Sequence, residues 1–422
     1  MMAIMKPFLR TVHLWAGLIF GTILVLQGLT GSLLSWRHEL DAWLNPGLLQ
    51  VAPPPGLGAG DAVRVTPAAV QAVTDRLAAT PGYGKPDMLM FPQHAGDVFI
   101  AWYRPQAPAS MWEVGVTRQV MVDPANLAIL GERNWGEAGL SRPLLMPTMF
   151  HLHRYLMAGD AGKLVIAVQG VALLLLTLTG IVLWWPRLSA SAFWNAITVR
   201  HGGNWPRFNF QLHRAAGFYA APLFLVTSVS GVYFNMPAWV TPVVNAVAPV
   251  TPNGKFTNRS AAGAPGIGAD EAVLAVQAQY PQARVSRLSF PAKAGQPFEV
   301  RVRQPGEWRQ GDGATRVSID SGNGAVLGAI DPLRDRGGNA FFSLMFPLHT
   351  GEAFGVVGRI VICIAGLLPL VFFVTGLVVY VKLRRKPAGK KQRAKPVAMT
   401  PAREPGAAGA SPESAMPAGL SK

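Results

Sequence analysis

Four apolar segments in this chain are each long enough to cross a lipid bilayer, which requires about 20 helical residues. The first, from Val12 to Trp36, contains no Lys, Arg, Asp or Glu. Of the 422 residues, 50% are hydrophobic and only 14% are charged, which excludes a disordered chain and an ordinary water-soluble protein. We therefore expect a membrane α-helical protein. The predicted transmembrane segments are 12–36, 161–186, 213–236 and 353–382.

Basic residues are concentrated in three stretches, and their distribution predicts the topology. The residues before the first segment carry +2, residues 186–214 carry +4 and the tail from Lys382 carries +8, which leaves only +2 of the net charge of +16 elsewhere. Because positive loops stay on the cytoplasmic side, we expect a multi-pass protein of a bacterial inner membrane with both termini in the cytoplasm. The predicted cytoplasmic segments are 1–11, 187–212 and 383–422, and the predicted periplasmic segments are 37–160 and 237–352.

Charge and cysteine content exclude several classes of site. Basic charge that follows the topology indicates contact with anionic membrane lipid, and we expect no nucleic-acid partner. The single cysteine, Cys363, excludes intramolecular disulfides and cysteine-rich metal sites. The first segment is too long for a cleaved signal peptide and lacks a small-residue cleavage site. The tail 383–422 is rich in Pro, Ala, Gly, Ser and Lys, which is typical of disorder.

The two halves of the chain resemble each other, which predicts an internal repeat. In each half a histidine is followed by a glycine after four residues and by a Thr-Gly or Ser-Gly pair after 17 and 18 residues: His13, Gly17 and Thr30-Gly31, then His213, Gly217 and Ser230-Gly231. An offset of 196 residues superposes Met149–His153 on Met345–His349 and Thr179-Gly180 on Thr375-Gly376. Outside the spans, residues 120–131 match 317–328, each with a strand–turn–strand pattern around an aspartate. We expect two copies of a unit made of a span, an outer α+β module and a second span.

Four repeat-equivalent histidines form the candidate site. His13 and His213 lie at the cytoplasmic ends of their spans, whereas His153 and His349 lie just before the outer ends of theirs. Because about 30 Å of hydrocarbon separates the two levels, each histidine can pair only with the other at its own level. Two facing imidazoles beside small residues suit the axial ligation of haem iron. We expect two haem b groups, one held by His13 and His213 and one by His153 and His349.

Other side chains near these histidines have weaker assignments. Arg10, Arg154 and Arg214 are candidate partners of haem propionates, and the nearby glycines Gly17, Gly217, Gly162 and Gly358 would let a flat macrocycle lie against the backbone. His38, at the outer end of the first span, is an alternative ligand, and His151 a weaker one. His94 and His201 fit ordinary surface positions. Zinc would need a third or fourth ligand, and no HExxH motif or cysteine cluster is present.

These spans and outer modules resemble the PepSY-associated transmembrane-helix family. The resemblance covers about residues 8–385 and is carried by His13 to Thr30-Gly31, by Leu348-His349 to Thr375-Gly376, and by Val317–Gly328. It implies four transmembrane helices arranged as two span–PepSY–span repeats, with two α+β PepSY-like periplasmic modules. Relatives in the family include inner-membrane reductases that hold b-type haems between their helices and reduce ferric siderophores. The resemblance therefore implies haem ligation by His13, His213, His153 and His349.

The expected function is electron transfer from the cytoplasmic side to a ferric siderophore or another periplasmic acceptor. No nicotinamide or flavin fingerprint is present, so the electron donor is an unidentified cytoplasmic or membrane partner, and no catalytic residue can be named. Two alternatives stay open at this stage. One is a membrane sensor or protease-regulating protein in which the modules bind peptide and the histidines are structural. The other is a component of haem or metal transport.

The topology can be tested with a reporter that is active only outside the cytoplasm. We expect activity from fusions after residue 100 or 300 and none from fusions after residue 195 or 390, because the stretches around the latter carry the basic charge. An active fusion after residue 195 would overturn the orientation and the assignment of each histidine pair to a side.

Overall fold

The structure is a computed structural model that describes residues 2–104, 108–186, 188–200, 204–252, 254–260, 266–293 and 295–384. The predicted tail 383–422 lies outside the described residues except for its first two positions, and so does His201. Within the described ranges, four helices are long and apolar enough to cross a membrane. They are α1 (Met2–Leu34), α6 (Gly159–Trp184), α8 (Trp205–Asn235) and α12 (Gly355–Arg384).

The third long helix begins earlier than its apolar segment. The predicted span starts at 213, whereas α8 starts at Trp205. The side chain of Asn204 caps it by accepting a hydrogen bond from the Arg207 backbone N–H at 3.2 Å, and Pro206 occupies the first turn. The cap at Asn204 and the proline in the first turn therefore start the helix about two turns before the predicted span.

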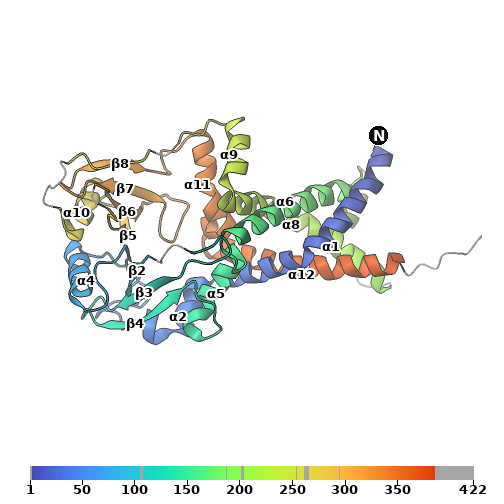
Figure 1. The fold of residues 1–422 in the computed structure, drawn as a ribbon. Coiled ribbons are helices and arrows are strands. Elements are labelled where there is room, and N and C mark those ends of the chain that lie inside the picture. Colours follow the sequence, from blue (N-terminus) through green and yellow to red (C-terminus); the bar gives the residue numbers. More distant parts are fainter. Residues whose placement is uncertain are drawn as a thin grey trace, which may run out of the picture. The chain divides into compact units, whose positions relative to one another are not determined.

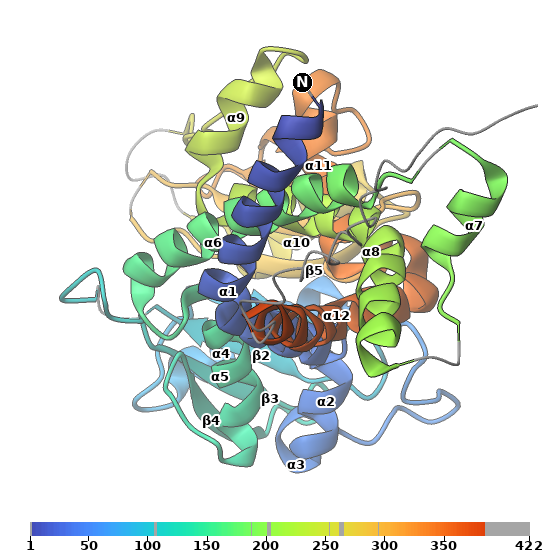
Figure 2. The same ribbon diagram turned by 90° about the vertical axis from the view of Figure 1, so that its right-hand side faces the viewer.

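Glycines allow the long helices to approach closely. A Cβ atom on Gly28 of α1 would collide with the backbone carbonyl of Gly366 on α12, and one on Gly366 would collide with the side chain of Ser32. The Ser32 hydroxyl also donates to the Cys363 carbonyl at 2.7 Å. Small residues at such a contact are the usual means by which membrane helices pack. Figure 2 faces the end of these helices that lies away from the sheet.

Eight strands form one antiparallel sheet in the order β4-β3-β2-β1-β5-β6-β7-β8. The first four strands are β1 (Met88–Met90), β2 (Phe99–Tyr103), β3 (Thr117–Val122) and β4 (Ile129–Trp135). The other four are β5 (Arg284–Ser289), β6 (Phe298–Arg303), β7 (Thr315–Ile319) and β8 (Val326–Ile330). The two outer segments therefore share one sheet, joined where β1 pairs with β5 and Leu89 lies opposite Leu288. This pairing satisfies backbone groups that two separate sheets would expose at their edges.

One face of the sheet carries the hydrophobic core. Helices α4 (Pro67–Ala79) and α10 (Ala269–Gln279) cover this face (Figure 1). They bury valines from both halves of the chain against fully buried side chains of the strands, such as Phe99 and Leu288. Alternate residues of the strands point to the opposite face, which is turned toward the membrane helices (Figure 1).

Shorter helices connect the sheet to the spans. They are α2 (Arg37–Leu44), α3 (Pro46–Leu49), α5 (Arg142–Tyr155), α9 (Pro237–Asn245), α11 (Gly337–Thr350) and the 3₁₀ turn η1 (Glu352–Phe354). A further short helix, α7 (Ala190–Ile197), lies in the chain between the spans α6 and α8. Helices α5 and α11 matter most for the site, because each comes just before a span and carries one of the predicted outer ligands.

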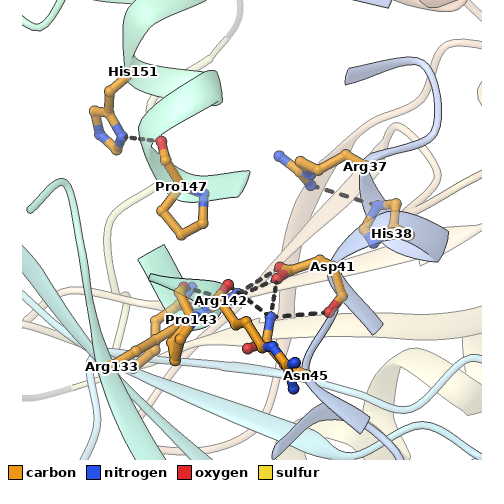
Figure 3. A network of polar contacts seen from close by, with 10 residues as sticks. Arg37, His38, Asp41, Asn45, Arg133, Arg142, Pro143, Pro147 and His151 are labelled. Atoms are coloured by element: carbon orange, nitrogen blue, oxygen red, sulfur yellow. Dashed lines mark hydrogen bonds and ion pairs between the residues drawn. The ribbon is translucent and has the colours of Figure 1, made fainter. Parts of the chain in front are cut away.

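A buried ion pair attaches the first half of the sheet to the helices beside the first span (Figure 3). Arg133 of β4 makes two 2.9 Å hydrogen bonds to the Asp41 carboxylate of α2, and its Nε donates to Gln119 at 2.7 Å. Asn45 bonds both Asp41 and the Arg142 carbonyl at 3.0 Å. Because all polar atoms of the pair are engaged, the desolvation of the two charges is compensated.

The contact between α1 and α12 yields a stability prediction. We expect Gly28→Ala to lower the free energy of unfolding by about 1–3 kcal/mol, because the added methyl group forces two backbones apart. Gly47→Ala is the matched control, since a Cβ on this helical glycine meets open space within the described residues. Thermal unfolding in one detergent compares the variants. Equal stability of the two variants would contradict the close contact.

Candidate functional site

The four predicted histidines form two pairs. The rings of His13 on α1 and His213 on α8 have their centres 6.3 Å apart, with an angle of 78° between their planes. The rings of His153 on α5 and His349 on α11 have their centres 6.5 Å apart, at 70°. The structure thus brings the histidines together in the pairs expected from their depths. Each pair joins one ring from the first half of the chain to one from the second.

Every ring is oriented by a hydroxyl group from a neighbouring helix. In the pair predicted to be the inner one, His13 Nδ1 lies 2.9 Å from Thr179 Oγ1 of α6, and His213 Nδ1 lies 2.7 Å from Thr375 Oγ1 of α12. For the outer pair, His153 Nδ1 lies 3.1 Å from Thr30 Oγ1 of α1, and His349 Nδ1 lies 2.7 Å from Ser230 Oγ of α8. These are the Thr-Gly and Ser-Gly positions of the sequence repeat.

The hydrogen-bond network assigns the ring tautomers. Each of the four hydroxyls also lies 2.6–2.8 Å from the backbone carbonyl four residues earlier in its own helix, to which it donates its one proton. It must then accept from the histidine, so Nδ1 carries the proton. His153 supports the assignment independently, because its Nδ1 also lies 3.1 Å from the Gln27 carbonyl, which can only accept. In their neutral form, all four rings therefore have an unprotonated Nε2, the form that ligates a metal.

The outer rings are also held neutral. Burial lowers the pKa of His153 to about 4 and that of His349 to about 3. A neutral imidazole is available for metal binding, whereas a protonated ring is not.

The spacing of the rings fits two ligands on opposite sides of one metal ion. A metal–imidazole bond is about 2 Å long and the ring centre lies about 1 Å beyond the nitrogen, so two opposed rings have centres about 6 Å apart. Both observed separations match this value. Among the described residues, no group of three or more His, Cys, Asp or Glu could hold a metal ion. The donor set at each level is therefore two imidazoles, which suits a cofactor that brings its own equatorial ligands, such as haem.

Glycines beside the rings have two different roles. Two glycines that follow orienting threonines lie close to a histidine ring. A Cβ on Gly31 would lie 3.0 Å from His153 Cε1, and a Cβ on Gly180 would lie 3.4 Å from His13 Cε1. Gly17 and Gly217, one turn after the inner histidines, leave room: a Cβ on Gly17 would meet only Leu176 at 3.9 Å, and one on Gly217 would meet nothing within 4 Å. This space fits the predicted role of these two residues beside a flat macrocycle.

The same interpretation is wrong for Gly162 and Gly358. A Cβ on Gly162 would collide with the Tyr155 carbonyl, and one on Gly358 with the Gly351 carbonyl. Both glycines lie at the sharp corner where a short histidine-bearing helix turns into a span. They are required for that turn, and the backbone fills the space that a cofactor would need.

The candidate propionate partners differ in their surroundings. Arg10 is exposed on α1, one turn before His13. The Arg154 Nε donates to the Tyr155 hydroxyl at 2.9 Å, and Arg214 donates to the Asn195 carbonyl of α7. The Arg214 Nε is buried and has no hydrogen-bond partner within the described residues. Propionate binding by these arginines stays a prediction.

The remaining histidines do not join either pair. His38 Nε2 lies 3.4 Å from the Arg37 guanidinium, whose charge lowers the pKa of His38 (Figure 3). His151 is buried, donates from Nδ1 to the Pro147 carbonyl at 2.9 Å, and stacks on Tyr155. His94 is exposed and pairs with Asp97 at 3.1 Å. A structural role accounts for His151, while ligation by His38 stays an untested alternative.

The orienting hydroxyls are the site residues that sequence reasoning missed. Thr30, Thr179, Ser230 and Thr375 marked the repeat, but nothing linked them to the histidines. The sequence did hold a signal for them, because there are as many hydroxyl–glycine pairs as repeat-equivalent histidines, and each pair follows its histidine at a spacing that is the same in both halves of the chain.

With this geometry established, comparison with protein families identifies the class. The family model described as PepSY-associated TM region matches residues 10–382. The chain belongs to this family, and it is a multi-pass membrane protein whose four apolar helices contact lipid. No curated protein matches the chain.

The hydroxyl contacts predict how strongly the His13–His213 site would hold the expected haem. We expect Thr179→Val to weaken haem retention by about 10–100-fold, the usual effect of losing a group that orients a metal ligand. Thr177→Val is the matched control, because Thr177 lies on the same helix and makes the same bond to its own backbone, with no histidine attached. Haem content and the Soret band after purification measure the effect. Equal retention by both variants would contradict the role of Thr179.

Proposed function

We propose that this chain is a di-haem membrane oxidoreductase that passes electrons from the cytoplasmic side of the bacterial inner membrane to a periplasmic acceptor, the ferric iron of a siderophore. The observation that carries the proposal is the presence of two imidazole pairs, each with a ring-centre separation that is compatible with one shared metal ion.

Bound haem supplies a one-electron carrier, and the protein supplies its position and surroundings. His13 and His213 would hold the inner group, and His153 and His349 the outer one. The orienting hydroxyls engage each Nδ1, which leaves Nε2 as the nitrogen that would bind the iron.

The distance between the two levels supports a relay. His13 and Thr30, which contact the inner and outer sites, are 17 residues apart on one helix, or about 26 Å along its axis. A single site at either level would leave most of the bilayer without a carrier. We propose that the two halves of the chain are repeats of one unit, so that each contributes one ligand to each level.

The direction of transfer follows from the predicted topology. The basic segments 1–11 and 187–212 would face the cytoplasm beside the inner pair, where an unidentified donor delivers electrons. The sheet would then lie in the periplasm beside the outer pair. Reduction of Fe(III) to Fe(II) by one electron loosens its hold by a siderophore, and no bond of the siderophore needs to break.

Haem counting in histidine variants tests the site. We expect His13→Ala and His213→Ala to remove the same haem and leave one per chain, and His153→Ala and His349→Ala to remove the other. His94→Ala is the control, because His94 is exposed and bonds only within its own loop. Nearly perpendicular ring planes also predict a highly anisotropic low-spin ferric signal in electron paramagnetic resonance. Haem loss in His38→Ala with retention in His153→Ala would transfer ligation to His38.

A reoxidation assay tests the reaction. Chemically reduced protein should be reoxidised by a ferric siderophore, with Fe(II) captured by a chromogenic chelator, and loss of the outer haem should abolish this. A purified protein without a Soret band would favour the sensor function. A haem-loaded protein that is not reoxidised by any ferric siderophore but is reoxidised by another oxidant would support electron transfer across the membrane and exclude ferric iron as the substrate.

A further inference from the structure

Four arginines gather on the face of the sheet that is turned toward the membrane helices. We call Arg37, Arg287, Arg301 and Arg309 the arginine cluster. Arg287 on β5 lies directly opposite Arg301 on β6. Along β6 the neighbours Val300 and Val302 enter the hydrophobic core, so Arg301 lies on the other face. Arg309 follows β6, and Arg37 begins α2.

The cluster has more positive than negative charge. Its acidic neighbours are Asp312, which bonds Arg287 at 2.7 Å and lies 3.9 Å from Arg309, Glu352 and Glu307 near Arg309, and Asp41 near Arg37. Burial alone would raise the pKa of Asp312, but Arg287 and Arg309 hold it below its usual value, so this carboxylate is ionised. Burial, with Arg287 and Arg309 adding to it, lowers the pKa of Arg301 to about 10, so Arg301 stays charged at neutral pH. Asp41 is already paired with Arg133, and Glu307 accepts a hydrogen bond from Thr315, so Asp312 and Glu352 are the carboxylates left to the four cations.

Several donors of the cluster are unused. The Nε atoms of Arg287, Arg301 and Arg309 are buried and have no hydrogen-bond partner within the described residues. Arg301 makes no side-chain hydrogen bond or ion pair in this part of the chain, although it lies between Arg287 and Arg316 on the neighbouring strands. Like charges opposite each other in a sheet are destabilising, and a buried donor without an acceptor adds to that cost. An anion would relieve both.

The cluster lies beside the outer histidine pair. The Arg309 guanidinium lies 3.9 Å from the ring centre of Phe346, and Arg37 lies 5.6 Å from that of Phe150. Phe346 and Phe150 each precede an outer histidine, His349 and His153, by three residues on the same helix. Phe346 and Phe150 would therefore lie between a ligand held by these arginines and the helix turns that carry His349 and His153.

We infer that the arginine cluster binds the negatively charged oxygen atoms of an anionic ferric chelate, one whose metal is held by catecholate or carboxylate groups. The identification of the ligand as a ferric chelate rests on the proposed function; the preference for an anion rests on the cluster itself. Planar guanidinium groups bind such oxygens through paired N–H donors. The cluster thereby selects anionic siderophores over neutral hydroxamate ones and holds them beside the outer pair.

Binding of redox-inert gallium chelates tests this inference. Titration of the haem-loaded full-length protein in detergent, followed by calorimetry, should show binding of a Ga(III) tris-catecholate complex and much weaker binding of a neutral Ga(III) tris-hydroxamate complex. We expect Arg301→Gln to weaken tris-catecholate binding by about 10–100-fold, the range for a hydrogen bond to a charged group. Arg334→Gln is the control, because Arg334 is exposed and pairs only with Asp331.

Stability separates binding from misfolding. Because the Arg301 side chain makes no hydrogen bond or ion pair with the described residues and lies between two other arginines, Arg301→Gln should leave the thermal stability of the unliganded protein unchanged or raise it. Arg301→Lys keeps the charge without the paired donors, and should bind with intermediate affinity. Equal affinity of wild type and Arg301→Gln for the tris-catecholate complex, or equal binding of the anionic and neutral complexes, would overturn the inference.

Two further outcomes have distinct meanings. Displacement of the gallium complex by an equal concentration of short-chain phosphatidylglycerol would assign the cluster to lipid headgroups and overturn the inference.

Gallium(III) cannot accept the electron, so its binding is measured separately from electron transfer. Gallium binding with no reoxidation by the ferric complex would refute the proposed function alone, and reoxidation without cluster-dependent binding would refute this inference alone.

Discussion

The hydrogen bond from a histidine Nδ1 to a helix hydroxyl is the interaction on which the site depends. It occurs four times, each time within one half of the chain: α1 with α6 and α5 in the first half, and α8 with α12 and α11 in the second. The rings then meet across the halves. Each half therefore orients two imidazoles by itself, and each pair of rings is completed only where the two halves pack together.

Part of this arrangement could be predicted from the sequence, because it depends on length and periodicity. The span-length apolar runs indicated four membrane helices, and the depth of the membrane allowed only one pairing of the histidines. Other contacts between distant elements could not be predicted. Nothing in Leu89 or Leu288 shows that β1 and β5 pair. Nothing local to Gly162 distinguishes a glycine that makes room for a ligand from one that makes room for the Tyr155 carbonyl.

The joined sheet has a consequence for the outer pair. Since α4 and α10 from the two halves share one core, the sheet is a single body beneath both α5 and α11. The Arg133–Asp41 pair attaches its first half to α2, and the stacking of Arg309 on Phe346 brings its second half against α11. A ligand on the membrane-facing side of the sheet would thus contact residues from both halves, close to the helices that carry His153 and His349.

Arg133 and Arg301, both on this face of the sheet, show how an arginine that stabilises the fold differs from one that is available to bind an anion. Arg133 has the carboxylate of Asp41, the amide of Gln119 and the Pro143 carbonyl as acceptors, so adding an anion would break existing bonds and gain little. Arg301 has like charges on both neighbouring strands and an unused Nε. Because the desolvation of a guanidinium is compensated only by an acceptor, the second environment gains free energy from an anion, whereas the first does not. The free donors, more than the number of arginines, therefore locate the region where an anionic acceptor would bind.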